Sequence, residues 1–432
     1  MQIKKLTQSI IGSKGFVLED ISHSPETNDF IFHVHLTKRL KCRCGICHKV
    51  SVFYDKGRGR RRWRCKDIGN GKAYVEADAP RVFCPEHGIV TAAVPWSRHG
   101  SRFTIDFENT VVWLATHSAH SAISELMRIE WHTVGHICKR VYRKWENSAT
   151  SRFNNLVNIG IDETSYKKGH KYMTVVVNHD TNSVIWCAVG FGSRILSRFF
   201  ESLTEEQRAS ICCVTADGAR WIASCISKYC PNAKRCVDPF HVVSWAMEAL
   251  EKVRHRALAE IRKRSAPVEK RGPGRPKKGE QVESVSKKAK AEKFTKFALL
   301  KNPENLTSLQ KEQVDFLSKA DPQLYRAYLL KENLRLLLKA DESEIVSSLK
   351  KWMSWAQRCR IPEFRDLRKK LKRHFEAITA TARYGLSNAR IEATNNKIKL
   401  TIRMAYGFRN MENLLAMVML NCSDIVLQLH ET

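Results

Sequence analysis

Two aspartates lie where an apolar stretch ends, which is a costly place for a carboxylate. Asp162 closes the apolar run 156–162, and Asp217 follows the apolar run 211–216. A carboxylate at the end of a buried strand loses its hydration, and the free-energy cost is offset only if the group is ion-paired, hydrogen-bonded or bound to a cation. Asp217 could instead cap a helix that follows it, whereas this alternative fits Asp162 poorly. The pattern therefore favours a chemical role for these carboxylates.

A third carboxylate, Glu392, lies in a segment whose spacing predicts a helix that begins at Ser387. One face of this helix would carry a carboxylate, two amides and a cation: Glu392, Asn395, Asn396 and Lys399. An adjacent stripe of isoleucines can be buried: Ile391, Ile398 and Ile402. The polar face could line a cleft, or it could be the charged face of a surface helix.

A second set of residues has the spacing of metal ligands. The set consists of two pairs, Cys44 with Cys47 and Cys84 with His87. Zinc prefers four such ligands in a closed tetrahedron, and a loop-rich region with few large apolar residues needs this cross-link to fold. The pattern predicts structural Zn²⁺, with unrelated free thiols as the alternative. Cys42 and Cys65 are alternative members of the set.

The charge of the chain indicates a polyanionic partner. Lys and Arg number 74 against 44 Asp and Glu, which gives a formal charge of +30, and nucleic acid is the leading partner for such a protein. No segment approaches the roughly 18 apolar residues of a membrane helix, so no membrane partner is expected. No signal peptide is evident, so we expect a cytoplasmic protein whose 14 cysteines are reduced thiols or metal ligands.

The segment 103–145 changes to a helical period. An apolar patch that includes Ile123 and Leu126, a turn at 128–130 and a second amphipathic helix have the spacing of a helix-turn-helix. The outward residues of the second helix would meet DNA: His132, His136, Lys139 and Arg140. An ordinary helical hairpin is the alternative, because the same spacing occurs in many folds.

Residues 262–301 hold 14 Lys or Arg against 4 acidic residues and few apolar groups. Such a segment cannot bury enough surface to be ordered alone. Its stretch 272–278 resembles the core of an AT-hook, which inserts an arginine into a narrow minor groove, and a basic linker is the alternative. Across the chain, the candidate DNA contacts are Arg60, Arg61, Arg62, Arg64, Lys139, Arg140, Arg275, Lys277, Lys278, Lys399, Arg403 and Arg409.

The elements that must position these residues follow from periodicity. Apolar runs and period-two alternation predict strands at 30–36, 156–162, 171–177, 183–189, 211–216 and 233–237. The segments 171–177 and 183–189 continue an antiparallel meander that begins with 156–162. Helices are predicted within 193–210, from 218 to about 229, and across the amphipathic region 304–380.

Four stretches together resemble the DDE transposases of the ISL3 insertion-sequence family. They are 161–170 (IDETSYKKGH), 217–218 (DG), 238–243 (DPFHVV) and 387–409, which begins SNARIEATNNKIK. The segments 84–88 (CPEHG) and 94–96 (VPW) resemble the zinc-finger region of that family. The resemblance extends from about residue 40 to 425, and the Gly/Pro/Lys-rich part of the central insertion does not match.

This resemblance implies a metal-dependent catalytic site. Asp162, Asp217 and Glu392 would bind two Mg²⁺ ions, with Mn²⁺ as a substitute, because phosphodiester transfer needs positive charge at both the attacking and the leaving oxygen. Asp217 and Asp238 compete for the second position. Asp217 is favoured because related transposases follow the second catalytic Asp with a downstream Cys/Asp-x-x-His signature, which Asp238 and His241 match. The supporting residues would be Asp238, His241 and Asn396.

The implied fold class is a multidomain α/β (α+β) protein with an RNase H-like mixed sheet. We expect a zinc-finger region at 1–100, a helix-turn-helix at 101–150, the first part of the catalytic core at 151–262, a basic linker and α-helical insertion at 263–380, and the C-terminal helices of the core at 381–432. The prokaryotic protein would associate with the nucleoid, bind terminal inverted repeats and target DNA, and assemble as a homodimer or higher homo-oligomer.

Two other functions compete with this hypothesis. A zinc-containing regulator that derives from a transposase and lacks catalysis explains the charge and the DNA-binding segments, but it leaves Asp162 and Asp217 unexplained. A nuclease that cuts without joining explains the carboxylates, but it does not need several DNA-binding segments.

Overall fold

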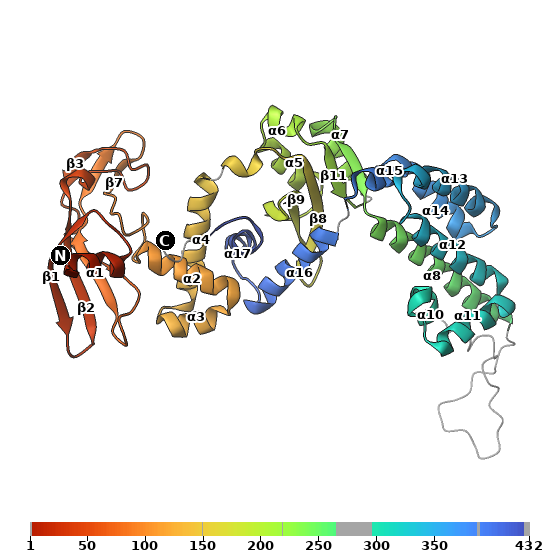
Figure 1. The fold of residues 1–432 in the computed structure, drawn as a ribbon, viewed down its shortest axis with the longest axis horizontal. Helices are drawn as coiled ribbons and strands as arrows, with labels where there is room; N and C mark the ends of the chain where they lie inside the picture. The colour runs from red at the N-terminus through yellow and green to blue at the C-terminus, as the bar shows by residue number, and fades with distance from the viewer. Residues whose placement is uncertain (1, 149, 218, 265–295, 387–388, 427–432) are drawn as a thin grey trace, which may run out of the picture. The chain divides into compact units, whose positions relative to one another are not determined.

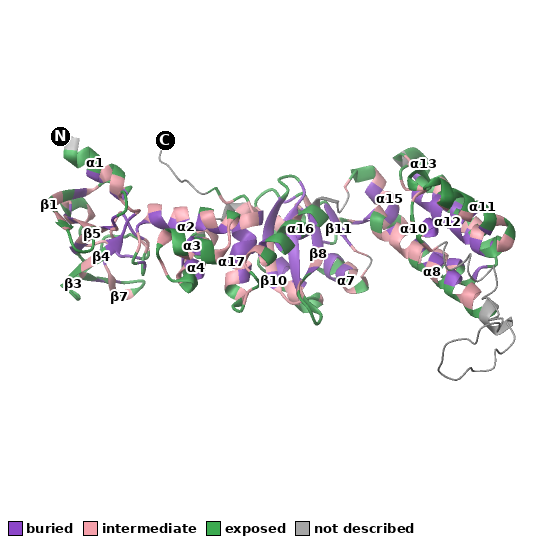
Figure 2. Ribbon diagram, turned by 90° about the horizontal axis from the view of Figure 1, so that it is seen from below, coloured by how far each residue is buried: buried purple, intermediate pink, exposed green. Residues whose placement is uncertain are grey.

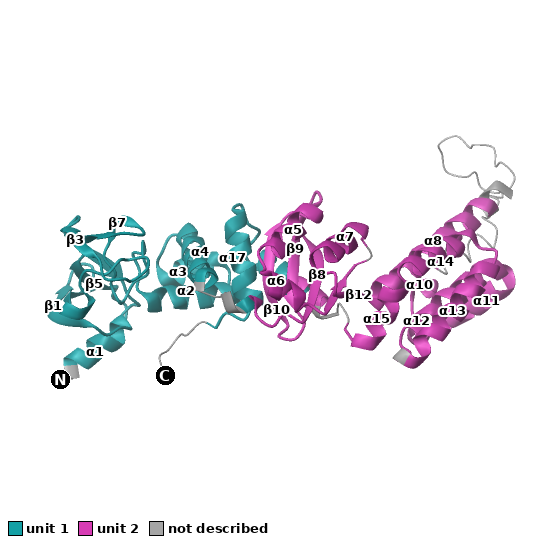
Figure 3. Cartoon of the chain, turned by 90° about the horizontal axis from the view of Figure 1, so that it is seen from above, with its two compact units in different colours: residues 1–152, 396–432 teal, residues 153–395 magenta. Residues whose placement is uncertain are grey.

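The computed structural model describes residues 2–148, 150–217, 219–264, 296–386 and 389–426. Two compact units divide the chain, one formed by 1–152 with 396–432 and the other by 153–395 (Figure 3). Ser387 and the basic residues Arg275, Lys277 and Lys278 lie outside the described residues. None of the described helices combines the length and hydropathy that a membrane span requires.

The first unit begins with two small sheets, whose strand orders are β1-β2-β5-β4 and β3-β6-β7 (Figure 1). Trp96 packs edge-on against Phe16 and Trp63, with ring centroids 5.9 and 5.6 Å apart, in the core under the larger sheet. The strand predicted at 30–36 is confirmed as β2, which extends over Asp29–Leu36. The elements are α1 (Gln2–Ile11), β1 (Phe16–Ser24), β2 (Asp29–Leu36), a 3₁₀ turn (Lys38–Leu40), β3 (Val52–Asp55), β4 (Arg60–Arg64), β5 (Ala73–Asp78), β6 (Arg81–Cys84) and β7 (Gly88–Thr91).

A helix-turn-helix follows in the same unit. It consists of α2 (Ile105–His117), α3 (His120–Met127) and α4 (Trp131–Ser148). Arg128 ends α3 in the left-handed conformation, with φ 52°, so the chain turns within three residues, as predicted. Ile123 is buried, but Leu126 is 66% exposed and does not join the predicted apolar patch. The helix α17 (Met411–Cys422) contributes Met417 and Leu420 to this core.

The second unit is built on one mixed sheet of order β10-β9-β8-β11-β12. Strands β8, β9 and β10 form an antiparallel meander, and β11 and β12 run parallel to β8. The mixed sheet agrees with the α/β fold class that we expected. The elements are a 3₁₀ turn (Thr150–Phe153), β8 (Asn158–Lys167), β9 (Lys171–Asn178), β10 (Ser183–Val189), α5 (Ser193–Glu201), α6 (Glu205–Ala209), β11 (Cys213–Ala216), α7 (Arg220–Tyr229) and β12 (Lys234–Val237).

The two faces of β8 have different partners because successive side chains alternate on a strand. Ile159 and Ile161 pack with Phe199 of α5 and Ile222 of α7, and Figure 2 shows buried residues concentrated along this sheet. Gly160 faces the other way, towards the helix α16 (Ala389–Met404). The missing side chain at this position lets the helix approach the strand.

Strand β8 does not end at Asp162, as the sequence predicts, but continues to Lys167. Its partner on one side, β9, pairs with it along this length, with Asp162 opposite Val175. Its partner on the other side, β11, pairs only with residues 158–160. The apolar run therefore stops close to the point where the pairing with β11 ends, and not where the strand ends.

A helical region interrupts the second unit between β12 and α16, as the pattern at 304–380 predicts. Its core contains Trp352, whose Nε1 donates to the carbonyl oxygen of Leu330 at 2.9 Å. The helices are α8 (Pro239–Arg264), α10 (Lys296–Leu300), α11 (Ser308–Ala320), α12 (Pro322–Leu337), α13 (Glu342–Arg358), α14 (Pro362–Arg373) and α15 (Phe375–Tyr384), with a 3₁₀ turn at Pro303–Asn305. Thr381 of α15 donates to the carbonyl oxygen of Val237 at 2.9 Å, which joins this region to β12.

The contact at Gly160 gives the first prediction. A Cβ atom at this position would collide with Cδ1 of Ile391 and would lie 2.7 Å from Nε2 of His179. We expect Gly160→Ala to lower the stability of the second unit by about 1–3 kcal/mol, which thermal unfolding measures. Ile391→Val removes the Cδ1 atom, so the double variant should regain part of the loss. A Gly160→Ala variant with unchanged stability would show that α16 does not pack here.

Candidate active site and zinc centre

The parallel register places Asp162 and Asp217 side by side. The pairing of β11 with β8 ends with Thr215 opposite Gly160. Two residues further along each strand are Asp217 and Asp162, and neighbouring strands lie about 4.8 Å apart. Both aspartates are only partly exposed. Two carboxylates therefore meet at the carboxyl end of the parallel strands.

Asp238 belongs to the next strand. The pairing of β12 with β11 ends with Val237 opposite Ala216, so Asp238 follows beside Asp217 and lies two strands away from Asp162. Its side chain is 7% exposed, and its Oδ1 accepts a hydrogen bond from the amide of Phe240 at 3.1 Å, in the first turn of α8. Asp238 therefore has a capping role in this structure.

Asp217 accepts a hydrogen bond from the turn that precedes α7. Its Oδ1 accepts from the amide of Ala219 at 2.7 Å. Ala219 is itself the N-cap residue of α7, which has no side-chain capping hydrogen bond, so Asp217 is not the helix cap that the sequence offers as an alternative. Its backbone carbonyl accepts from the guanidinium of Arg235 at 2.6 Å. These contacts fix the position of Asp217 next to Asp162.

The surroundings of Asp162 on balance disfavour its ionised form. Burial raises the pKa of this carboxyl, and the charge of Asp217 raises it further. Two hydrogen bonds and the charge of His241 act in the opposite direction. The amide of Glu163 donates to Oδ1 at 2.8 Å, and Nδ2 of Asn395 donates to Oδ2 at 2.6 Å. An ionised Asp162 would therefore gain from a cation.

The hydrogen bond from Asn395 fixes which face of α16 lies against β8. Ile391 lies over Gly160, and Asn395 lies over Asp162. Four helical residues rise by about 6 Å and two strand residues by about 6.6 Å, so the two contacts match along the helix. Glu392 comes three residues before Asn395, on the same face, and is exposed.

The sequence predicts Asn396 as the supporting amide, but the amide that reaches Asp162 belongs to Asn395. Asn395 is 6% exposed, and Asn396 is exposed. Both residues belong to the polar face of the predicted helix, and spacing alone does not separate them. His241, which the sequence analysis also chose, lies close enough for its charge to favour the ionised form of Asp162.

Glu163 is a further carboxylate near this site and is not among the residues predicted from the sequence. Burial raises the pKa of its carboxyl, and the charges of Asp217 and Asp162 add to this effect. Its Oε1 accepts from the amide of Gly192 at 3.4 Å, at the start of α5. The adjacent Asp-Glu pair was a visible signal, but strand alternation argues that Glu163 points away from Asp162.

The four predicted zinc ligands come together from two places in the small sheet. Cys44 and Cys47 precede β3, Cys84 ends β6, and His87 lies in the turn to β7. Their ligand atoms all lie within 4.8 Å of one another, and the Sγ atoms of Cys47 and Cys84 are 3.7 Å apart. Zn–S bonds of about 2.3 Å in a tetrahedron give a similar separation. No other group among the described residues gathers its donor atoms this closely.

The alternatives within the zinc set do not fit the geometry. Cys65 is fully buried in the core of the larger sheet, where burial raises the pKa of its thiol to about 12. Cys42 lies outside the cluster. A hydrogen bond with His87, by contrast, lowers the pKa of Cys84 to about 6 and favours the thiolate that binds zinc.

Comparison with known protein families finds matches along most of the chain. Residues 159–418 match the ISL3 family model that is described as a transposase and carries DDE in its name. The chain belongs to the ISL3 family of transposases. Residues 92–142 match the helix-turn-helix domain of this transposase family, and residues 40–87 match the zinc finger of the IS204, IS1001, IS1096 and IS1165 transposases.

Curated relatives cover nearly the whole ISL3 transposase. The transposase for insertion sequence element IS1557 of Mycobacterium tuberculosis is 44% identical over 425 residues, which are 97% of this chain and 96% of the relative. The transposase for insertion sequence element IS1001 of Bordetella parapertussis is 24% identical over 95% of this chain and 96% of the relative. The ISL3 transposase is thus a DNA-binding enzyme that cleaves and transfers DNA strands, and this favours the main hypothesis over a regulator without catalysis.

The candidate DNA contacts on β4 of the transposase have partners within the protein. Arg64 is 7% exposed, and its guanidinium is bound to Asp67 at 2.6 Å. Arg61 donates to the carbonyl oxygen of Ser101 and lies over the ring of Trp63. The remaining two arginines pair with glutamates: Arg60 with Glu19, and Arg62 with Glu76. Arg64 therefore supports the fold from within, whereas Arg60 and Arg62 remain at the surface.

The candidates on α4 and α16 differ in the same way. Lys139 pairs with Glu412 at 2.8 Å, and Arg140 pairs with the buried Glu108 at 2.9 Å. Among the candidates at the C-terminal end of α16 and just after it, all are exposed: Lys399, Arg403 and Arg409.

The zinc centre gives the second prediction. Cys47→Ser removes one of four ligands, so the purified transposase should hold less than half an equivalent of zinc and unfold at a lower temperature. Cys42→Ser serves as the control, because it removes a nearby thiol outside the cluster and should keep about one equivalent. Elemental analysis measures both. Equal zinc contents in the two variants would contradict the assignment of Cys47.

The surroundings of Asp162 give the third prediction. Its folded pKa lies above the unfolded value, so its favourable contribution is complete below the unfolded pKa and is lost as pH rises through the folded pKa. Without metal, Asp162→Asn should therefore have a higher unfolding midpoint than the wild type at pH 7.5, and the difference should shrink towards pH 4. Mg²⁺ should raise the midpoint of the wild type more than that of the variant. A difference that is constant with pH would contradict this account.

Proposed function

We propose that Asp162, Asp217 and Glu392 hold two divalent cations, Mg²⁺ or its substitute Mn²⁺, and that the transposase cuts and joins insertion-sequence ends by a DDE mechanism. The observation that carries this proposal is the register that brings Asp162 and Asp217 together at the end of the parallel strands. The hydrogen bond of Asn395 with Asp162 adds the helix of Glu392 to the same place.

The donor set fits hard divalent cations. Carboxylate oxygens are the ligands that Mg²⁺ and Mn²⁺ prefer. Burial and the neighbouring Asp217 disfavour the charge on Asp162, and a cation would reverse both effects. Among the described residues, these carboxylates are not yet gathered as closely as the zinc ligands. Glu392 is exposed, so its side chain has freedom to move towards a cation.

When bound, the two cations would supply positive charge at the attacking and leaving oxygens of the phosphodiester. Asp162 and Asp217 provide the negative charge that retains such cations, and Asn395 orients the Oδ2 atom of Asp162. The charge of His241 favours the ionised form of Asp162 and so acts against the effect of burial. Asp238 positions the first turn of α8, which carries His241, through its hydrogen bond with the amide of Phe240.

The assignment of Asp217 as the second ligand rests on distance across the sheet. Asp217 lies one strand from Asp162, and Asp238 lies two strands away and is nearly buried. Two ions that share ligands lie about 3.5–4 Å apart, which favours neighbouring strands. Asp238 therefore acts as a positioning residue.

The remaining parts of the proposed function concern partners. The zinc finger, the helix-turn-helix and the exposed basic residues that follow Glu392 would recognise the terminal inverted repeats and the target DNA. The Cys3His set would hold one structural Zn²⁺. Two ends must be joined to one target, so the active form is a homodimer or a higher homo-oligomer on DNA.

The fourth prediction tests the three carboxylates together. Asp162→Ala, Asp217→Ala and Glu392→Ala should each lower strand transfer of a pre-cut end by at least 10³-fold, because each removes a ligand that acts in the transition state. Binding to end DNA should change by less than about threefold, since phosphate contacts lie elsewhere. Strand-transfer and binding assays on the same preparations measure both.

Asp238→Ala decides between the two candidates for the second position. It should weaken strand transfer less than Asp217→Ala does, and Asp238→Asn should recover much of the activity because an amide oxygen can still cap α8. An inactive Asp238→Asn together with an active Asp217→Ala would assign the second ligand to Asp238.

A further inference from the structure

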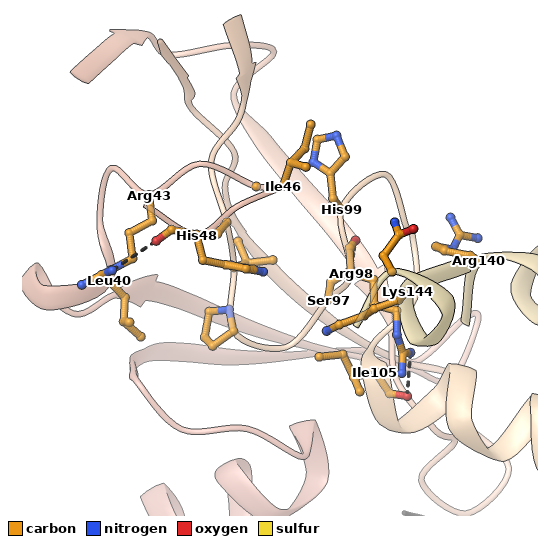
Figure 4. A pocket seen from close by; sticks show the side chains of 15 residues that line it. Leu40, Arg43, Ile46, His48, Ser97, Arg98, His99, Ile105, Arg140 and Lys144 are labelled. Carbon is orange, nitrogen blue, oxygen red and sulfur yellow. Dashed lines mark hydrogen bonds between the residues drawn. The ribbon is translucent and has the colours of Figure 1, made fainter. Parts of the chain in front are cut away.

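A cavity of about 650 Å³ lies within the first unit, between the zinc finger and the helix-turn-helix. Its wall comes from three places: the loop that holds Cys44 and Cys47, the segment 93–99, and one side of α4 (Figure 4). None of the described residues that line it is acidic. The basic residues that line it are Arg43, His48, Arg98, His99, Arg140 and Lys144.

Two of these arginines are held against the wall by one buried carboxylate. Glu108 is completely buried and pairs with Arg98 at 2.8 Å and with Arg140 at 2.9 Å. Arg98 also donates to Asn109 at 2.7 Å, and Arg140 donates to the carbonyl oxygen of Gly100 at 3.2 Å. The lining carries four Lys or Arg charges and Glu108 lies behind it, so the lining and this carboxylate together have a net charge of 4 − 1 = +3.

The zinc finger contributes a cation with a fixed position. The guanidinium of Arg43 donates to the carbonyl oxygens of His48 at 3.2 Å and Arg39 at 3.3 Å. Backbone carbonyls orient this side chain but do not neutralise it. Figure 4 shows Arg43 and His48 on the loop, with Lys144 on the helix. Desolvation and then the charge of Arg98 lower the pKa of Lys144, as expected where positive charges are crowded.

We propose that this cavity binds a backbone phosphate of the insertion-sequence end, and that the zinc finger and α4 hold the same DNA strand through it. The proposal rests on the DNA-binding role of the proposed function. A lining with several Arg and Lys side chains and no acidic residue is suited to a phosphate group. The apolar residues in the wall, such as Ile46 and Pro95, could contact a deoxyribose beside it.

The position of the cavity on the helix-turn-helix agrees with a phosphate contact. In such motifs the first turns of the second helix read base edges. Arg140 and Lys144 lie further along α4, which begins at Trp131. Phosphate contacts fix the register and orientation of a protein on DNA, and base contacts specify the sequence. A phosphate held here would set how deeply the start of α4 enters the groove.

The test compares Lys144→Ala with Lys14→Ala in the full-length, zinc-loaded protein. Lys14 is exposed in the same unit and does not line the cavity, so both variants lose one charge. Lys144→Ala should weaken binding to end DNA about tenfold and reduce the salt slope by about one, on specific and non-specific duplexes alike. Lys14→Ala should change the affinity by less than about twofold. Zinc content and the unfolding midpoint confirm that each variant folds.

Methylphosphonate substitution then identifies the phosphate. We expect one backbone position at which a neutral methylphosphonate weakens the wild type about as much as Lys144→Ala does, with no further loss when both changes are combined. Arg43→Gln should weaken binding to the unmodified duplex, but it should cause no further loss of affinity on the duplex that carries the methylphosphonate at this position. If the loss from Lys144→Ala persists in full on every substituted duplex, the proposal is overturned.

Inorganic phosphate separates DNA from a free anion. If phosphate binds at low millimolar concentration in a Lys144-dependent manner while end-DNA affinity is the same for Lys144→Ala and wild type, the cavity binds a free anion and the proposal is overturned. If the wild-type protein fails to bind end DNA, the proposed function is contradicted as well. If it binds end DNA normally but the effect of Lys144→Ala is independent of every methylphosphonate, only the phosphate site in this cavity is contradicted.

Discussion

The packing of α16 against β8 is the contact on which the catalytic geometry depends. It needs a glycine on the strand, because a side chain at Gly160 would collide with Ile391, and it needs the amide of Asn395 to meet Asp162. The first requirement is steric, and the second is polar. Together they set both the depth and the rotation of the helix that carries Glu392. The chain brings together residues that are more than 200 positions apart through one apolar and one polar contact.

Charge within the fold is used in two different ways. Around Asp162, burial and a neighbouring carboxylate disfavour the ionised form, so the site is arranged to gain from a cation. In the cavity between the zinc finger and α4, one buried carboxylate organises two arginines and leaves an excess of positive charge. One place is suited to bind a metal cation and the other a phosphate. Several other cations, such as Arg64, are paired within the fold.

The sequence predicts elements and ligands best where the information is local. The strand at 183–189 and the turn at 128–130 are confirmed, because alternation and helix spacing depend on neighbouring residues. The zinc set is predictable because its spacing reflects two local knuckles. The choice between Asn395 and Asn396 and the continuation of β8 beyond Asp162 depend on partners that are distant in sequence. Glu163 was not predicted as part of the site for a related reason. Alternation describes the two faces of one strand, but it does not show that the charges of Asp217 and Asp162 act on Glu163.

The helix-turn-helix core has a consequence for synthesis. Met417 and Leu420 of α17 pack with helices that lie within residues 105–148, so this core is not made from consecutive sequence. During translation, α2, α3 and α4 leave the ribosome with part of their apolar surface uncovered, and it is covered only after the catalytic carboxylates have been made. A chain that stops before residue 411 carries all three carboxylates but an incomplete DNA-binding core. The order of synthesis thus couples tight DNA binding to the presence of the catalytic residues.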